Sequence, residues 1–337
     1  MLNYKSLSVV GLAKNTGKTE TLNFLLSQLK DSGKCVAVTS IGLDGEQTDQ
    51  IFGTKKPEIT IYKGMIFVTV ERFFAEKTMP AEILNISEMP TTLGKIVTAR
   101  ALETGKVILS GAADTATLKK IIAQNAVLGA DLTLVDGATS RLSLASPAVT
   151  EAMILATGAA LSANMQELVR KTKFVCSLVA LETVDETLKS RLQHIEKGLW
   201  GIDKAGELHD FGVTSSLVVN HFTEANKAIL QQAEMIFCAG AVSDKLLNLL
   251  TIHKLNKTPF TLVAKDFTHL FVSPYAYSTF AKKGGCIKVL HHTQLLALTV
   301  NPTSPEGYVF DSEQLQEALR QEIDVKVFDV RKILHNL

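Results

Sequence analysis

The stretch that decides the fold runs from Gly11 to Thr19 and reads G-L-A-K-N-T-G-K-T. It follows the apolar run 7–10 and precedes an amphipathic pattern over 18–31, so the sequence predicts a strand, a glycine-containing loop and a helix. Backbone N–H groups in such a loop and in the first helical turn can converge on phosphate oxygens. Gly17 lets the main chain approach closely and adopt angles that other residues avoid. The stretch therefore predicts a phosphate-binding loop, and with it a nucleotide.

The side chains of this loop have distinct predicted roles. Lys18 supplies a mobile positive charge for the terminal phosphates, and the Thr19 hydroxyl is suited to ligate Mg²⁺. Asn15 and Thr16 either contact phosphate or only stabilise the turn. The competing interpretation is a tight β–α turn with an exposed lysine, because the spacing G-x₅-G-K-T holds one more residue than the common pattern. The loop residues expected to line the nucleotide are Lys14, Asn15, Thr16, Gly17, Lys18, Thr19 and Glu20.

Composition bounds the class of protein. The chain has 337 residues, 46% of them hydrophobic, which is enough for two domains with a sizeable core. Basic and acidic residues number 35 and 34, so no global field attracts nucleic acid or an anionic membrane. No apolar run reaches the roughly 18 residues of a transmembrane helix. The four cysteines have no close pairing and fit a reducing compartment. We expect a cytoplasmic chain without membrane or nucleic-acid partners. Both a monomer and a homodimer are compatible with the sequence.

Apolar runs rich in β-formers alternate with helical patterns through the first 240 residues, which predicts a doubly wound, mainly parallel α/β sheet. We assign residues 1–239 to one nucleotide-binding domain with an insertion at 184–212, and residues 240–337 to a small C-terminal α/β domain or an extension. Asp114 is expected to cap a helix. Strands are expected at 6–11, 35–41, 66–70, 106–110, 131–136, 174–180, 214–219, 260–263, 286–289, 295–300 and 324–329. Helices are expected at 18–31, 92–103, 114–128, 147–156, 224–234, 240–250 and 312–322.

Two acidic segments can position Mg²⁺. The first, 39–49, follows the second strand and contains Asp44, Glu46 and Asp49. Because ligands sit beyond the carboxyl ends of parallel strands, this segment is expected near the phosphates, although a solvated acidic turn would have the same composition. The second is an apolar strand that ends in Asp136 and a glycine, the usual layout of a Mg²⁺-binding strand end. Its competing interpretation is a turn aspartate that caps the following loop.

These three motifs, in this order, resemble dethiobiotin synthetase and its relatives in the SIMIBI class of P-loop NTPases. The resemblance implies phosphate and Mg²⁺ roles for Lys18 and Thr19. It also implies that Asp49 is a metal ligand and that Asp136 stands where the family has glutamate. Asn220 in V-V-N resembles a strand-terminal asparagine that reads adenine. The resemblance covers motifs within residues 5–235 and does not extend to a substrate region.

The predicted cofactors are therefore ATP and Mg²⁺, since the chain has no N-K-x-D motif of the kind that reads guanine. Thr19, Asp49 and Asp136 are the predicted metal ligands, and Lys18, Asp44 and Asp49 the predicted catalytic residues. The side chain of Arg141 either clamps a substrate anion or lies on the surface.

Two functions follow for such an ATPase. One is an ATP-driven switch or chaperone that acts on a partner protein, as in metallochaperones and cobalamin-enzyme reactivases of the same class. The other is a ligase or kinase that activates a small carboxylate by phosphorylation, as in dethiobiotin synthetase. The missing substrate motif favours the switch.

Overall fold

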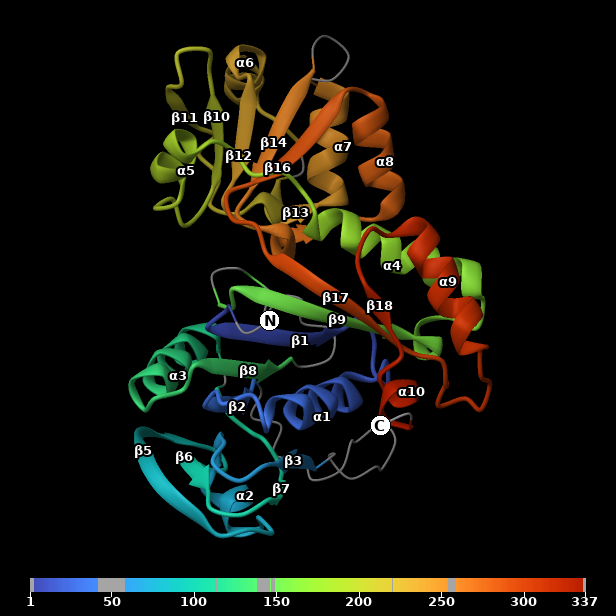
Figure 1. Ribbon diagram of the computed structural model, residues 1–337. Coiled ribbons are helices and arrows are strands. Elements are labelled where there is room, and N and C mark those ends of the chain that lie inside the picture. Colours follow the sequence, from blue (N-terminus) through green and yellow to red (C-terminus); the bar gives the residue numbers. More distant parts are fainter. Residues whose placement is uncertain are drawn as a thin grey trace. The chain divides into compact units, whose positions relative to one another are not determined.

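The chain forms two compact units in the computed structural model, which describes residues 3–41, 58–112, 114–137, 146, 149–219, 221–253 and 259–335 (Figure 1). Unit 1 combines Met1–Lys173 with Gln294–Leu337, and unit 2 is Phe174–Thr293. The chain therefore does not divide near residue 239, where the sequence placed a boundary. Unit 2 is an insertion in unit 1, and the last segment of the chain belongs to the same unit as the first.

Unit 1 is built on a mixed, mostly parallel sheet. Within the described residues nine strands pair in the order β18-β17-β9-β1-β8-β2-β4-β6-β5. Every neighbouring pair from β18 to β4 is parallel, and β6 pairs antiparallel with β4 and β5. The expected α/β class is thus confirmed. The strands are β1 (Ser6–Gly11), β2 (Val36–Ser40), β4 (Ile66–Val70), β5 (Ala81–Thr91), β6 (Gly94–Ala101), β8 (Leu132–Asp136), β9 (Ala152–Gly158), β17 (Gln294–Asn301) and β18 (Val327–Phe328). A separate ladder joins β3 (Ile59–Ile61) and β7 (Gly105–Val107).

Helices cover both faces of this sheet. Leu7 and Val9 of β1 share one core cluster with Leu22 of the first helix, whereas Val135 of β8 shares another with Leu118 of the third. All residues of β1, β2 and β9 are buried, as expected for parallel strands covered on both sides. The helices are α1 (Lys18–Leu29), α2 (Glu71–Ala75), α3 (Thr115–Val127), α9 (Ser312–Glu322) and α10 (Val330–His335), with a 3₁₀ turn at Ala159–Leu161, and α4 (Met165–Val179) begins in unit 1 and ends in unit 2.

Unit 2 has its own sheet, with the strand order β11-β10-β12-β14-β16. Within the expected insertion, β10 (Leu199–Ile202) and β11 (Leu208–Asp210) form an antiparallel hairpin, while β12 (Met235–Cys238), β14 (Phe260–Ala264) and β16 (Gly285–Val289) run parallel. A two-stranded ladder joins β13 (Val242–Ser243) and β15 (Leu270–Phe271). The helices are α5 (Glu186–Leu192), α6 (Glu224–Gln232), α7 (Asp244–His253) and α8 (Pro274–Lys282), with 3₁₀ turns at Ser216–Val218 and Phe267–His269.

Two expected helices are strands. The range 92–103 contains β6, at 94–101, and the range 147–156 overlaps β9. The strand β9 lies between β1 and β17, so all seven of its residues are buried and its apolar run has no period-two alternation. Periodicity cannot separate such a run from a buried helix. The prediction of helix was therefore wrong for a physical reason, which is burial on both faces.

Two expected strands are also corrected. Residues 174–179 belong to the second half of α4, a helix in which Leu168, Thr172 and Cys176 are buried at helical spacing. Residues 214–219 contain a single 3₁₀ turn, which begins at Ser216 after the Ser215 side chain accepts a hydrogen bond from the Leu217 N–H. In both places a short apolar run suggested a strand although no neighbouring strand pairs with it.

Other expectations held. The strands at 6–11 and 66–70 and the helix at 312–322 have the expected bounds. Asp114 caps α3, with its carboxylate accepting the Thr117 N–H at 2.8 Å. All four cysteines are free. In the part of the chain that the structure describes, no helix is both long and apolar enough to pass through a bilayer.

The tight packing of β9 against β17 gives a test of the fold. A Cβ added at Gly158 would overlap the carbonyl oxygen of Asn301 and lie 2.9 Å from its carbonyl carbon. We expect Gly158→Ala to lower the free energy of unfolding by about 1–3 kcal/mol, because backbone atoms must shift. The measurement is urea denaturation. Gly240→Ala is the control, because its nearest neighbouring atom lies at 3.8 Å, and it should unfold like the parent. A Gly158→Ala protein as stable as the parent would contradict this packing.

Candidate functional site

The carboxyl ends of four parallel strands meet at one edge of the unit 1 sheet. Val9 of β1 is in register with Asp136 of β8, and Gly11 with Ala156 of β9. On the far side of β9, Asn301 of β17 is in register with Gly158. Figure 1 shows these strands side by side. The β1–α1 loop, residues 11–17, leaves the sheet at this edge, which is where ligands bind in open α/β sheets.

The β1–α1 loop has a specific backbone conformation. Asn15 and Gly17 have left-handed φ angles of 61° and 90°, which asparagine tolerates and glycine favours. The Thr16 hydroxyl donates to the carbonyl of Ala13 at 2.9 Å, and the Leu12 N–H donates to the carbonyl of Ala156 at 3.0 Å. Of the two roles open to Thr16, the structure therefore supports turn stabilisation, since its buried side chain bonds within the loop. The side chains of Lys14 and Asn15 are exposed.

The loop folds back over its own first residue, which explains the glycine there. A Cβ on Gly11 would lie 2.6 Å from the Thr16 hydroxyl oxygen and 2.8 Å from Cγ of Lys18. Gly137 is equally constrained, because its Cβ would lie 2.8 Å from the carbonyl oxygen of Val9. Because these two residues lack a side chain, the aliphatic part of Lys18 can pack against the end of β1, and the residue after β8 can approach the β1 backbone.

Lys18 joins the loop to the second predicted motif. Its ammonium donates a hydrogen bond to the carbonyl of Gly137, directly after β8. Burial lowers the pKa of Lys18 below its ordinary 10.5, while the neighbouring Asp136 carboxylate acts in the opposite direction. The structure thus brings together Lys18 and Asp136, which are 118 positions apart in the sequence (136 − 18). The sequence predicted these two residues from two different motifs, and their proximity is consistent with a single site.

The N-terminus of α1 has no capping side chain. Its N-cap residue is Gly17, in contrast to α3, α5, α6, α8 and α9, each of which begins after an aspartate, serine or threonine that accepts a backbone N–H. The first turn of α1 therefore presents its positive end to the loop without a competing oxygen from a cap. Thr19 and Glu20 belong to this turn. The Glu20 carboxylate accepts a hydrogen bond from Arg331 of α10 at 2.5 Å.

Asn301 is a site residue that sequence reasoning missed. Its side-chain Nδ2 donates to the carbonyl of Asn15 at 2.9 Å, and its Oδ1 accepts the Thr303 N–H at 3.2 Å. Only 7% of Asn301 is exposed. The signal available was the strand-terminal V-N-P at 300–302, but no pattern in the sequence pairs that strand with the strands around the loop.

A second contact reinforces this link between β17 and α1. The hydroxyls of Thr21 and Thr299 lie 2.8 Å apart, and Thr21 also donates to the carbonyl of Gly17 at 2.9 Å. Thr299 and Asn301 of β17 therefore support α1 and the loop.

Several predicted residues lie outside the described part of the chain, namely Asp44, Glu46, Asp49, Arg141 and Asn220. The strand that was expected to end at Asn220 is replaced by the 3₁₀ turn at Ser216–Val218 in unit 2. Among the residues that the structure describes, no group of three histidine, cysteine, aspartate or glutamate side chains is arranged to hold a metal ion. Thr19 and Asp136 are the two predicted metal ligands that remain.

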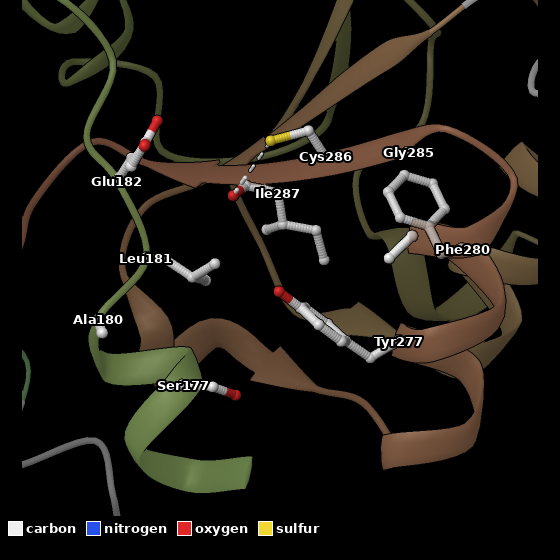
Figure 2. Close-up of a pocket in the computed structure, with 10 residues that line it drawn as sticks. Ser177, Ala180, Leu181, Glu182, Tyr277, Phe280, Gly285, Cys286 and Ile287 are labelled. Atoms are coloured by element: carbon white, nitrogen blue, oxygen red, sulfur yellow. Dashed lines mark hydrogen bonds between the residues drawn. The ribbon is translucent and has the colours of Figure 1, made fainter. Parts of the chain in front are cut away.

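A separate cavity of about 250 Å³ lies in unit 2 (Figure 2). Figure 2 shows Tyr277 and Phe280 extending from α8 toward β16, with Leu181 on the opposite side. Burial raises the pKa of the Tyr277 hydroxyl, and the nearby Cys286 acts in the same direction. The walls are mainly apolar, and the polar groups of Tyr277 and Cys286 show no hydrogen bond to each other. The edge of the unit 1 sheet remains the better candidate site.

No family model, curated protein or solved structure matches the chain. The candidate site is therefore assigned from its geometry alone.

Proposed function

We propose that this chain binds Mg²⁺–ATP at the β1–α1 loop and hydrolyses it. The observation that carries the proposal is the placement of the Lys18 ammonium, which spans the end of β1 and contacts Gly137 beside Asp136. A lysine at the first position of an uncapped helix, facing a carboxylate at the neighbouring strand end, suits a triphosphate and its metal. The left-handed residues Asn15 and Gly17 shape the main chain around the same point.

The residues present fit both groups. The positive end of α1 and the Lys18 ammonium complement phosphate charge, and glycine at positions 11 and 137 allows the Lys18 side chain and the β1 backbone to pack where a Cβ would collide. Thr19 and Asp136 are the oxygen ligands that would hold Mg²⁺, joined by Asp49 in the sequence-based proposal. When bound, Mg²⁺ supplies neutralisation of phosphoryl charge. The catalytic assignments of Lys18, Asp44 and Asp49 remain part of this proposal.

Lys18 has to exchange partners during binding. In the structure its ammonium donates to a neutral carbonyl, that of Gly137. A phosphate oxygen is a stronger acceptor because it carries charge. Burial lowers the pKa of Lys18 and the Asp136 carboxylate acts in the opposite direction, so Asp136 favours the charged ammonium that a phosphate would bind. Binding therefore needs a side-chain movement of Lys18 away from the carbonyl of Gly137.

We add Asn301 to the expected Asn220 as a contact for the base. Asn301 ends a strand of the loop-bearing sheet and donates a hydrogen bond to Asn15. A carboxamide has two N–H groups and two acceptor sites on its oxygen. One of each is used by Asn15 and Thr303, which leaves one donor and one acceptor for the edge of a base.

The arrangement of the chain favours a switch over a ligase. Unit 2 is inserted between β9 and β17. These are the two strands that contact the loop, through Ala156 and Asn301. A rearrangement of the loop on hydrolysis would therefore act on both connections to unit 2, and ordering or release of loops by the terminal phosphate is a common switching device. The partner of such a switch is a protein. The alternative remains a ligase or kinase for a small carboxylate.

Lys18→Ala tests the nucleotide site. We expect Mg²⁺–ATP to bind about 10- to 100-fold more weakly, since a hydrogen bond to a charged group is worth about 1.5–3 kcal/mol. Calorimetric titration measures the affinity. Lys30→Ala, at the other end of α1, removes a charge from the same helix and should bind like the parent. Equal affinities for parent and Lys18→Ala would refute the assignment.

Asn301→Ala tests the base contact. We expect ATP affinity to fall about tenfold and inorganic triphosphate affinity to fall less, because only ATP carries a base; tenfold corresponds to about 1.4 kcal/mol. The measurement is a pair of titrations with the two ligands. If both affinities fell by the same factor, Asn301 would only hold the loop and the base assignment would be wrong.

Turnover separates the two functions. We expect slow phosphate release from Mg²⁺–ATP that a panel of small mono- and dicarboxylates leaves unchanged, with Lys18→Ala as the inactive control. Limited proteolysis should also differ between ATP and ADP near residues 174 and 293, where the chain enters and leaves unit 2. Strong stimulation by one carboxylate, with identical cleavage patterns, would support the ligase and rule out the switch.

A further inference from the structure

A hollow of about 610 Å³ lies in unit 1 between α1 and the last segment of the chain. Its walls come from α1, β9, β17, the β18 region and α10, and most of them are apolar. Phe24, Leu296, Val325 and Ile333 line it and are only half-buried, while Phe328 is 38% exposed. None of the residues discussed for the hollow belongs to the unit 2 cavity.

The topology explains why this space is open. At this edge the sheet ends in β18, which has two residues, and the chain returns over it with α10, which has six. Pairing of β17 with β9 is also irregular between Leu295 and Ala297. Protein interiors are close-packed, so half-buried apolar side chains around a hollow of this size keep apolar surface in water. A partner that fills the hollow would remove that surface from water.

The size of the hollow selects a small molecule as the occupant. Binding pockets for small ligands span roughly 300–1,000 Å³. A helix with its side chains is about 10–12 Å across, so a few turns of a partner helix would need more space than this hollow provides. Its inner end carries the hydroxyls of Thr21 and Thr299, which already bond to each other and to Gly17. Because these hydroxyls already have hydrogen-bond partners, an apolar tail can lie against them without leaving them unpaired. A charged head group would gain few hydrogen bonds there.

The mouth carries two opposite charges. Asp324 and Lys326 both line the hollow and are exposed. Among the described residues, neither side chain has an ion-pair partner within 4.0 Å. A head group that carries both an anion and a cation complements this pair, whereas a head with a single charge would face one residue of like charge.

We propose that the hollow binds an amphiphile with an apolar tail and a zwitterionic head, with the tail toward Thr21 and Thr299 and the head between Asp324 and Lys326. The proposal does not rest on the proposed nucleotide function: Lys18 and Asp136 do not line the hollow, although Thr21 and Thr299 also support the β1–α1 loop.

Three probes of equal chain length test this assignment: 2-aminodecanoic acid, decanoic acid and decylamine, each below its micelle-forming concentration and without nucleotide. Calorimetric titration of the full chain should give saturable binding of 2-aminodecanoic acid. Decanoic acid and decylamine should each bind about two- to fivefold more weakly, the worth of one exposed ion pair. No saturable binding of any probe would overturn the site. Equal binding of all three would overturn the head-group assignment.

Variants locate the binding site. Val325→Trp places a large side chain in the hollow and should abolish binding of 2-aminodecanoic acid. Val309→Trp is the matched control, because Val309 is 64% exposed and lies outside the hollow, and it should bind like the parent. Lys326→Ala should weaken 2-aminodecanoic acid about two- to fivefold and leave decylamine no weaker, since only the former has a carboxylate. Unchanged binding by a folded Val325→Trp protein, checked by its unfolding transition, would place the ligand elsewhere.

Discussion

The parallel pairing of β1 between β8 and β9 is the constraint on which the candidate site depends. Parallel strands put their carboxyl ends at one edge, so the loop after β1 meets the residues that follow β8, β9 and β17. The contact of Lys18 with Gly137 and that of Leu12 with Ala156 both follow from this register. A shift of either neighbour by one residue would turn every side chain on that strand to the other face of the sheet.

The last segment of the chain completes the site. Asn301 and Asn15 are 286 residues apart in the sequence, yet their hydrogen bond holds the loop in its left-handed conformation. Such a contact forms only after a long loop has closed, which makes it expensive in chain entropy. The loop therefore cannot reach its final support until unit 2 has been synthesised and β17 has paired with β9. The chain enters unit 2 after β9 and returns from it into β17, and these two strands also position the loop.

The sequence alone identified the elements whose conformation depends on residues close to one another in the chain. The strand, loop and helix at residues 6–29, the strand that ends at Asp136 and the cap at Asp114 all depend on neighbours within a few positions. The strand β9 was mistaken for a helix because burial on both faces removes the alternation that marks a strand. For the segment 174–180 the error was the reverse: a strand was predicted where the chain is helical, since a run of a few apolar residues fits either structure. The domain boundary was misplaced because both units are α/β, so composition does not change where the chain passes between them.

By itself the sequence determined which residue types stand in the loop and at the strand end: a glycine and a lysine at the start of the first helix, and an aspartate followed by a glycine at the end of an apolar strand. These depend on residue type and short spacing. Only the tertiary structure decided which strand lies beside which, and hence that Lys18 meets Asp136, that Asn301 supports Asn15, and that a hollow remains beside α1. The physical reason is that strand order is set by burial and pairing across the whole chain, and no local pattern of residues encodes it.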